Sequence, residues 1–291
     1  MKIAYLILAH HMPEHLPRLV RALNDRGVDF NIHVDAKTDM TPFLGCAAPN
    51  VHFVAPRIPV KWGRWSLVEA TLALMRQALS RRVPYDYLVL LSGACYPIRS
   101  RSYIQRFLEQ NQGGEFIQCA RMPEPLPASL SYAHLWRQGL GDLQAYIGSS
   151  WWALTSEACR YILDFPTAHQ TAMKYFEKTR LPEEMFFQTV LANSPFAPQM
   201  RRKLTYADWS IGGSHPADIT PRHVRTLEKN WEKMDIFGNP SACFTRKIPN
   251  DGGAVVDLID NMVARLDGAP YRAVDLLLRK EPAVPFQVQF K

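Results

Sequence analysis

Two adjacent glutamates stand where a general base could work. Glu183 and Glu184 lie in LPEEMFFQTVL, directly after Pro182, and apolar and aromatic residues follow at once. Proline and acidic residues both suit the first turn of a helix, so one interpretation is a helix start with no further role. In the alternative interpretation, one glutamate lies at the rim of an apolar pocket, where partial burial would raise its pKa toward that of a useful base.

A second group of residues is basic. Arg246 and Lys247 lie in FTRKI, between the apolar residues Phe244 and Ile248. Other cations of the second half form short clusters at Arg201, Arg202, Lys203, Arg222 and Arg225. The ordinary interpretation of such charges is a solvated face. Cations set between apolar residues could instead stabilise a leaving diphosphate, as a metal ion would.

A third group consists of tryptophans in Gly- and Ser-containing contexts. They are Trp62 and Trp65 in KWGRWS, Trp151 and Trp152 in GSSWWAL, and Trp209 in YADWS. Each is either a core residue or a platform that stacks on a base or a sugar ring. Aromatic and basic residues do not interleave as they do in an RNA-binding strand, so nucleic acid is not expected as a partner.

Several familiar motifs are missing from the sequence. It has no G-x-G-x-x-G, no P-loop, no G-x-S-x-G, no H-E-x-x-H and no D-x-D. His10 and His11 are adjacent at the end of a predicted strand. Neighbouring strand residues point to opposite faces, so this pair is not expected to chelate one ion. We therefore expect no cofactor, and a metal-bound diphosphate is disfavoured, although scattered carboxylates could still converge on an ion.

These residues need a scaffold, and the hydrophobic pattern predicts an alternation of strands and helices. Strands are expected at Ile3–Ala9, Phe30–Val34, Val51–Ala55, Tyr87–Leu91, Glu115–Cys119 and Gly148–Thr155, and helices at His15–Asn24, Ser66–Leu79, Ser102–Gln110, Ser156–Phe165, Pro182–Ala192 and Ala254–Leu266. Residues 193–250 read as loops with short elements. The result is an α/β fold with a Rossmann-like, mostly parallel sheet. His10-His11, Asp35 and Ser92-Gly93 follow strands directly, so they should meet at one sheet edge.

Composition limits the function classes. The 291 residues carry a formal charge of +7, and 47% are hydrophobic, which excludes a wholly disordered chain. Five scattered cysteines argue against a disulfide framework and for a reducing compartment. The apolar run at the start is too short to span a membrane. We therefore expect a cytoplasmic protein, with peripheral contact to the inner membrane as an option.

Taken in order, AYLILAHH, IHVDAKTD, VKWGRWSLVEA, YLVLLSGACYPIRS, GSSWWALTSEA, LPEEMFFQTVLANSP, LTYADWS, SHP and FTRKI resemble the core-2/I-branching β-1,6-N-acetylglucosaminyltransferase and peptide O-xylosyltransferase family. The resemblance implies a GT-A glycosyltransferase domain over residues 1–250, followed by a helical extension and tail over residues 251–291. It also implies metal-independent transfer of a sugar from a UDP-sugar to a hydroxyl of a glycan or glycoconjugate, with inversion. N-acetylglucosamine is the favoured sugar, and xylose or another hexose is the alternative.

The resemblance also implies residue roles. Glu184 matches the glutamate that acts as general base in the N-acetylglucosaminyl members, and Asp35 matches a residue that contacts uracil. Trp62 matches an aromatic residue beside the uridine, and Lys247 matches a lysine that binds the diphosphate. The second diphosphate cation is open between Arg225, Lys203 and Arg246. The complete donor-binding set is expected to be Leu8, His10, Asp35, Trp62, Ser92, Cys95, Arg225, Arg246 and Lys247. The acceptor-binding set is expected to be Tyr96, Gln118, Ser150, Trp151, Trp152 and Trp209.

The chain departs from the family pattern at three positions. Cys95 replaces an aspartate of S-x-x-D-Y-P, Ser150 replaces the aspartate that is the proposed base in the xylosyl members, and Thr205 replaces an arginine. These changes weaken a xylosyl assignment and leave Glu184 as the candidate base. They also motivate an alternative, a UDP- or carbohydrate-binding module of the same fold without catalysis. A basic nucleic-acid-binding protein is a third and weaker alternative.

Overall fold

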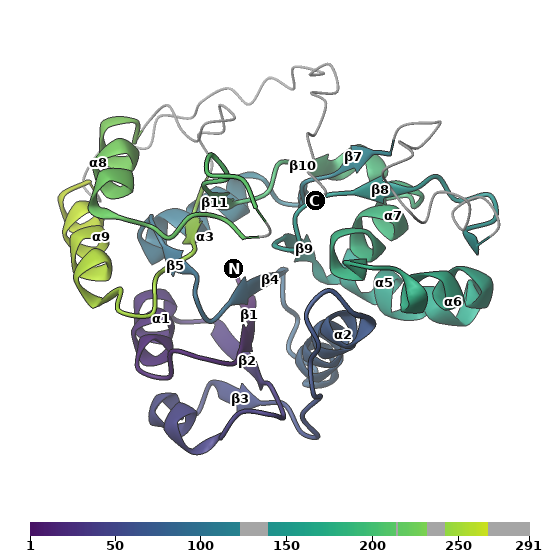
Figure 1. The fold of residues 1–291 in the computed structure, drawn as a ribbon, viewed down its shortest axis with the longest axis horizontal. Coiled ribbons are helices and arrows are strands. Elements are labelled where there is room, and N and C mark those ends of the chain that lie inside the picture. Colours follow the sequence, from purple (N-terminus) through teal and green to yellow (C-terminus); the bar gives the residue numbers. More distant parts are fainter. Residues whose placement is uncertain (123–138, 214, 232–241, 267–291) are drawn as a thin grey trace.

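A seven-stranded sheet in the order β10-β6-β9-β4-β1-β2-β3 forms the centre of the fold (Figure 1). β1 pairs in parallel with β2 and β4, β2 with β3, and β10 with β6, whereas β9 runs antiparallel to β4 and β6. The strands are β1 (Ile3–Ala9), β2 (Val28–Val34), β3 (Val51–Phe53), β4 (Tyr87–Ser92), β6 (Glu115–Phe116), β9 (Ala153–Thr155) and β10 (Met200–Arg201). The predicted α/β fold with a mostly parallel sheet is confirmed.

The computed structural model describes residues 1–122, 139–213, 215–231 and 242–266. The tail from Pro270 onward, expected to hold a short helix and an extended end, lies outside these residues. In the described part, no helix is both long and apolar enough to cross a membrane. All five cysteines fall within it, and none forms a disulfide.

Helices cover both faces of the sheet, so every residue of β1 is buried. Alternate side chains of the strand enter different cores: Tyr5 and Ile7 pack on one face, and Leu6 and Leu8 on the other. The first face is covered by α1 (His15–Leu23), α3 (Arg101–Gln110), α8 (Pro221–Lys229) and α9 (Gly253–Leu266). The second is covered by α2 (Trp65–Ser80), α5 (Ser156–Ala168), α6 (Gln170–Lys178) and α7 (Phe186–Ala192).

A small second sheet brings the end of the chain to the edge of the first. It has the order β11-β12-β5, formed by β11 (Thr205–Ala207), β12 (Phe244–Arg246) and β5 (Tyr96–Pro97). Since β5 follows β4 after a short turn, its antiparallel pairing with β12 carries Arg246 back to the end of β4. A third pair joins β7 (Ala120–Arg121) to β8 (Tyr146–Ile147).

Helix α9 lies beyond residue 250 but shares the core of the sheet. Its buried residues Val256 and Ile259 belong to the same hydrophobic cluster as β1. Its Asp260 accepts a hydrogen bond from the Tyr96 hydroxyl at 2.7 Å and pairs with Arg18 at 2.9 Å. The described part of the expected extension is therefore packed into the body of the fold.

Two expected elements differ in the structure, and one observed helix was not expected. The predicted helix over 182–192 is split into η2 (Pro182–Glu184), a 3₁₀ turn, and α7, because the Glu184 carbonyl accepts from the Gly148 N–H at 2.8 Å. The predicted strand over 148–155 shortens to β9, since residues 148–152 form the loop that makes this contact. Helix α6 was not predicted, although Ala172, Tyr175 and Phe176 bury one helical face. Two further 3₁₀ turns are η1 (Thr41–Cys46) and η3 (Ala197–Gln199).

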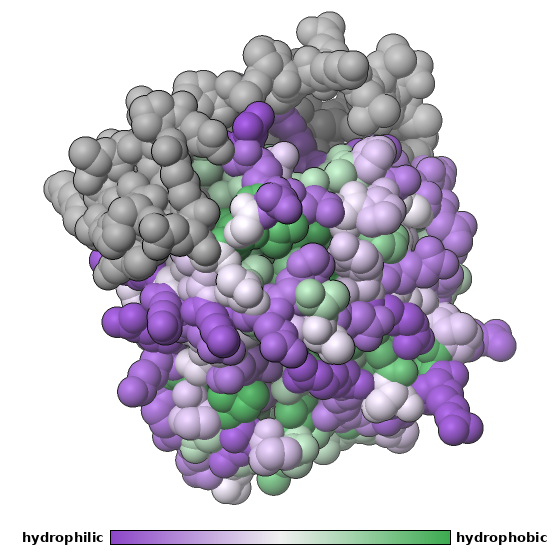
Figure 2. All heavy atoms as spheres, turned by 90° about the vertical axis from the view of Figure 1, so that its right-hand side faces the viewer, coloured by the Kyte–Doolittle hydropathy of each residue, from purple (hydrophilic) through white to green (hydrophobic). Residues whose placement is uncertain are grey.

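Figure 2 shows the face that lies on the right-hand side of Figure 1. Hydrophilic residues dominate its coloured part, and hydrophobic ones form small separate groups. A face of this kind is the ordinary solvated surface of a folded domain.

Candidate active site

Asp35 is fixed at the edge where β1 and β2 end. Its N–H donates to the Ala9 carbonyl at 2.9 Å. Its carboxylate accepts from the N–H groups of Lys37 at 2.9 Å and Val60 at 3.3 Å, and the Lys37 ammonium lies 3.5 Å away. The side chain is buried. The sequence therefore places an oriented carboxylate directly after a strand, as predicted.

Arg246 crosses from the small sheet to the end of β4. It donates to the Ser92 hydroxyl at 2.5 Å, and its guanidinium lies 4.5 Å from the ring centre of Trp151. Burial lowers the pKa of Arg246, and a hydrogen bond with Cys95 opposes the shift. The Cys95 thiol in turn contacts the Ser92 hydroxyl at 3.3 Å. Two residues expected in the donor site, Ser92 and Cys95, thus hold the Arg246 cation, and the expected acceptor residue Trp151 lies against it.

Lys247 lies beside this cation. Its carbonyl accepts from the Ile219 N–H at 2.8 Å, and the next N–H, of Ile248, donates to the Ala94 carbonyl at 2.9 Å. The Lys247 ammonium is 3.8 Å from an Asp218 carboxylate oxygen whose side chain is half exposed. An exposed pair at this distance is weak. The backbone therefore anchors Lys247 firmly, while its ammonium can accept another anion.

His10 and His11 follow β1 and stack on each other with ring centroids 4.2 Å apart. The expectation that they point to opposite faces is wrong, because β1 ends at Ala9 and both residues lie in the bend that follows. Burial lowers the pKa of both rings, and the charges of Arg246 and Lys247 lower it further. The pKa of His11 falls to about 4, so this ring is uncharged at pH 7, whereas the charge of Asp35 opposes the shift at His10.

Trp62 belongs to the same edge. It is 53% exposed, and its ring meets His215 edge-on with centroids 5.7 Å apart. The pKa of His215 is lowered by burial first and then by the charges of Lys247 and Arg246. An exposed indole therefore stands next to the cation pair, as a stacking platform would.

Glu184 lies in η2, between two loops of the site. The N–H of Leu181, at the start of this turn, donates to the Gly63 carbonyl at 3.1 Å, next to Trp62. The Glu184 carbonyl binds Gly148 in the loop that carries Trp151. Burial raises the pKa of Glu184 from 4.5 to about 7, and the charge of Lys203 opposes the shift. The pKa shift expected of a general base is present.

Glu183 is the more buried of the pair, only 5% exposed, and its Oε2 has no hydrogen-bond partner among the described residues. Burial, with a smaller contribution from the charge of Glu184, raises its pKa to about 7 as well. A base must reach its substrate, so the less buried Glu184 is the better candidate of the two.

Two backbone features fix the turn that carries these glutamates. Leu181 adopts left-handed geometry with φ of 55°, which is uncommon outside glycine and clusters at functional sites. A Cβ at Gly148 would lie 1.8 Å from the Gln118 carbonyl oxygen, so only glycine fits there. The position of Glu184 thus depends on two residues that do no chemistry.

Some predicted site residues belong to the core instead. Leu8 packs in the cluster under α2. Tyr96 is 2% exposed, with its hydroxyl bonded to Asp260, and Trp152 is 2% exposed and packs on Phe187. We therefore correct the acceptor assignment of Tyr96 and Trp152, since neither side chain reaches the surface. Leu8 can contribute to a donor site only through its backbone.

Four other predicted residues lie nearer the surface, on helix α8 and on loops. Arg225 is exposed on α8. Trp209 is 41% exposed in a turn that begins at Asp208. Gln118 and Ser150 are half-buried on loops beside Gly148. Arg246 rather than Arg225 is thus the cation that the structure sets beside Lys247.

Sequence reasoning missed two residues that the structure adds to this edge. They are Lys37, which pairs with Asp35, and His215, whose pKa the charges of Lys247 and Arg246 lower. Lys37 lies two residues after Asp35 in the segment IHVDAKTD, so its closeness to Asp35 could have been predicted from the sequence. The position of His215 could not, because it depends on contacts between distant loops.

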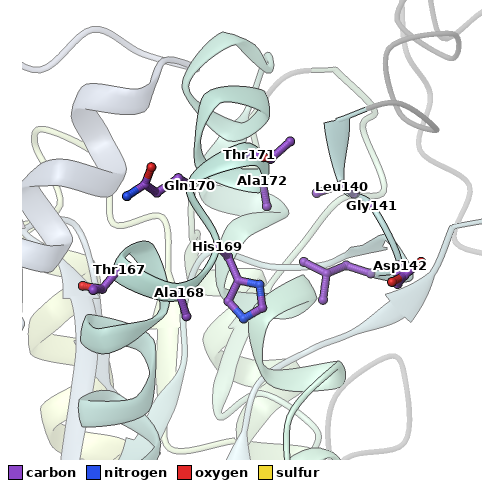
Figure 3. Close-up of a pocket in the computed structure, with 10 residues that line it drawn as sticks. Leu140, Gly141, Asp142, Thr167, Ala168, His169, Gln170, Thr171 and Ala172 are labelled. Atoms are coloured by element: carbon purple, nitrogen blue, oxygen red, sulfur yellow. The ribbon is translucent and has the colours of Figure 1, made fainter.

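A separate hollow of about 460 Å³ lies between the end of α5, the start of α6 and residues 140–143 (Figure 3). The labelled His169 ring points into this gap (Figure 3). None of the predicted site residues lines it. Within the described ranges, no three His, Cys, Asp or Glu side chains group as metal ligands would.

Comparison with known proteins gives the family. Residues 3–231 match the family described as Core-2/I-branching enzyme. The chain belongs to this family. Human xylosyltransferase 2 is 30% identical over 216 residues, which is 66% of this chain and 25% of that protein. Human xylosyltransferase 1 is 28% identical over 230 residues, or 72% of this chain and 24% of that protein.

This Core-2/I-branching chain spans about a quarter of the length of the curated relatives it matches. The crystal structure of mouse xyloside xylosyltransferase 1 in its apo form aligns with a TM-score of 0.41 and 10% identity, covering 84% of this chain and 97% of that one. The family membership thus rests on sequence, and the α/β architecture rests on the strand order described above.

Proposed function

We propose that this chain is an inverting glycosyltransferase that moves a sugar from a UDP-sugar to a hydroxyl group of a glycan or glycoconjugate. One observation carries the proposal. Glu184, with a pKa near 7, is tied by backbone hydrogen bonds to the loops of Trp62 and Trp151, and Trp151 covers the Arg246 cation. The segments that carry a base, a stacking surface and a cation are therefore joined by hydrogen bonds and ring contacts.

In the proposed reaction, Glu184 removes the proton of the acceptor hydroxyl as that oxygen attacks the anomeric carbon. Attack occurs opposite the diphosphate, so the configuration inverts through an oxocarbenium-like transition state. Arg246 and Lys247 stabilise the negative charge that builds on the leaving UDP. Fixed cations in a partly dry site do this without reorganisation, which is why Arg246, held by Ser92, suits the role.

Uridine would lie across the ends of β1 and β2. The Asp35 carboxylate, already held by two N–H groups, is oriented to accept from the base. The exposed face of Trp62 is open for stacking. These contacts agree with the roles that the family resemblance implies for both residues.

We propose that no metal ion or other cofactor takes part. Arg246 and Lys247 supply the two positive charges that a divalent cation would bring to a diphosphate. Activity in excess EDTA is the expected outcome. Loss of activity in EDTA with recovery in Mn²⁺ would show that the proposal of metal independence is wrong.

The donor sugar is proposed to be N-acetylglucosamine, because Glu184 is a carboxylate of raised pKa at the position of the family's general base and position 150 holds serine. Xylose is the second candidate, and the xylosyltransferases among the relatives favour it. Cys95, which occupies the place of a family aspartate, contacts Ser92 and Arg246 and offers no carboxylate to a sugar hydroxyl. A polysaccharide or another surface glycan is the proposed acceptor class.

A panel of UDP-GlcNAc, UDP-Xyl, UDP-Glc and UDP-Gal tests the proposal through slow donor hydrolysis, which needs no acceptor. Release of UDP from one donor well above the rates of the others, and undiminished by EDTA, is expected. Binding of UDP without turnover of any donor would favour the alternative of a non-catalytic module.

A further inference from the structure

Asp208 and His223 form a half-buried hydrogen-bonded pair that the proposed chemistry does not use. His223 Nε2 lies 2.8 Å from Asp208 Oδ2. On the other side of the ring, Nδ1 lies 3.0 Å from the backbone nitrogen of Thr220 and 2.7 Å from its hydroxyl oxygen. A backbone N–H can only donate, so Nδ1 is the accepting nitrogen. The proton of the neutral ring is therefore on Nε2, and His223 donates it to the Asp208 carboxylate.

The same carboxylate holds the turn that follows β11. Asp208 Oδ1 accepts from the Ser210 N–H at 2.8 Å, and Oδ2 accepts from the Ser210 hydroxyl at 3.1 Å. The Asp208 carbonyl accepts from the Ala217 N–H at 2.7 Å. His223 lies in the first turn of α8. The Asp208–His223 pair therefore ties the end of β11 to the start of α8 and closes the connection between them.

This connection is attached to the proposed donor site at both of its ends. Ala207, the last residue of β11, pairs with Arg246 of β12. Near α8, the Ile219 N–H donates to the Lys247 carbonyl at 2.8 Å. An Asp218 carboxylate oxygen also lies 3.8 Å from the Lys247 ammonium. The connection thus holds the segment that carries both cations from two sides.

Between its ends, the connection reaches the exposed indole. The His215 ring meets Trp62 edge-on, with centroids 5.7 Å apart. His215 lies two residues before Ala217, whose N–H is held by the Asp208 carbonyl. The position of the His215 ring against the indole therefore depends on the residue that His223 holds.

We propose that Asp208 and His223 are positioning residues of the donor site. Their hydrogen bond keeps the His215 ring against Trp62, so that the indole is set for the nucleotide before it binds. Through the same connection it fixes the backbone that carries Lys247. Neither residue touches the nucleotide. The inference rests on the proposed function, because it needs UDP at Trp62 and Lys247.

Loss of this hydrogen bond should act on affinity and not on turnover. The apparent dissociation constant rises in inverse proportion to the fraction of molecules in the competent arrangement. A hydrogen bond to a charged group shifts such an equilibrium by about tenfold or more, so the Kd for UDP and the KM for the donor should each rise about tenfold. The kcat should stay within about twofold, because saturating donor restores the arrangement. The turn that carries Glu184 is held by the loops of Gly63 and Gly148 instead.

Two substitutions at position 223 separate this hydrogen bond from the capping of α8. In His223→Asn the short side chain can still accept from the Thr220 N–H but cannot reach Asp208, so the Kd for UDP should rise about tenfold. In His223→Gln the longer amide can still donate to Asp208, so the Kd should stay within about threefold of the wild type.

Tyr85→Phe is the matched control for the loss of one hydrogen bond. It removes a 2.6 Å bond from the Tyr85 hydroxyl to the Asp29 carboxylate, near the residues where β2 and β4 begin. This is the opposite edge of the sheet from the proposed donor site, so the Kd for UDP should not change. Calorimetry with UDP gives the Kd, and UDP release from UDP-GlcNAc or UDP-Xyl gives KM and kcat.

Three results would overturn the proposal: a wild-type Kd in His223→Asn, equal losses of affinity in His223→Asn and His223→Gln, or a loss in Tyr85→Phe as large as that in His223→Asn. A fall in kcat without a rise in KM would also overturn it. Each of these leaves the donor site intact, because the wild type still binds UDP. Absence of UDP binding by the wild type instead contradicts the donor site itself and, with it, the role of Asp208 and His223.

Discussion

Replacing Glu184 by glutamine tests the assignment of the general base. The amide has nearly the same shape but cannot accept a proton. Loss of a general base typically lowers the rate by about 10²–10⁴-fold. Because Glu184 is proposed to act on the acceptor hydroxyl and not on the nucleotide, UDP affinity should stay within about twofold, which is the scatter of a neutral substitution.

The pKa of about 7 also sets the pH dependence of the wild-type rate. At pH 6 about one tenth of Glu184 is ionised, and at pH 8 about nine tenths. The kcat for donor turnover should therefore rise about tenfold between these pH values and level off above pH 8. The assay is UDP release at saturating donor, so that the pH dependence of binding does not enter.

Glu183→Gln is the matched control, because it makes the same change one residue away. It should retain a rising pH profile, with a midpoint below that of the wild type, since the charge of Glu183 no longer opposes ionisation of Glu184. The assignment is refuted if Glu184→Gln turns over donor like the wild type, or if Glu183→Gln is the variant that loses activity.

The remaining predictions concern stability and geometry. Burial raises the pKa of Glu183 in the folded state from 4.5 to about 7, so its favourable contribution to the free energy of unfolding is complete below pH 4.5 and is lost as the pH rises through 7. In urea unfolding, the free energy of unfolding of Glu183→Gln should rise by about 3 kcal/mol relative to the wild type between pH 4.5 and 8. The same pH dependence in both proteins would contradict this. In Cys95→Asp the new carboxylate should pair with Arg246 and weaken UDP binding about tenfold by calorimetry, whereas the UDP affinity of Cys95→Ser should stay within about twofold of the wild type. Equal UDP affinities of the two variants would show that Arg246 does not bind the diphosphate. Gly148→Ala should displace the loop from Gln118 and reduce kcat at least about tenfold with UDP affinity little changed, and an unaltered kcat would mean that this loop does not position Glu184.

Local patterns were enough to predict most of the scaffold. The apolar run over Ile3–Ala9 and the helical spacing of Ser66–Leu79 each match an observed element, because burial against a sheet imposes these periods. The shared edge of Asp35 and Ser92 followed from parallel strand direction alone. These predictions needed no knowledge of distant contacts.

The errors arose where distant segments decide the structure. The break after Glu184 depends on the N–H of Gly148, some thirty-five residues earlier in the chain. Tyr96 lies in the core because its hydroxyl donates a hydrogen bond to Asp260 of α9. Arg246 reaches Ser92 through the pairing of β12 with β5. No pattern within a short window contains such information.

The central claim, that the edge formed by Asp35, Trp62, Arg246 and Lys247 is a UDP-diphosphate site facing Glu184, is tested most directly by a crystal structure of the chain with bound UDP. The account predicts the uracil ring beside Asp35 and Trp62, phosphate oxygens within hydrogen-bond distance of both cations, and a Glu184 carboxylate left free for an acceptor. UDP bound at another surface, or a diphosphate held by Arg225 away from Arg246 and Lys247, would contradict it.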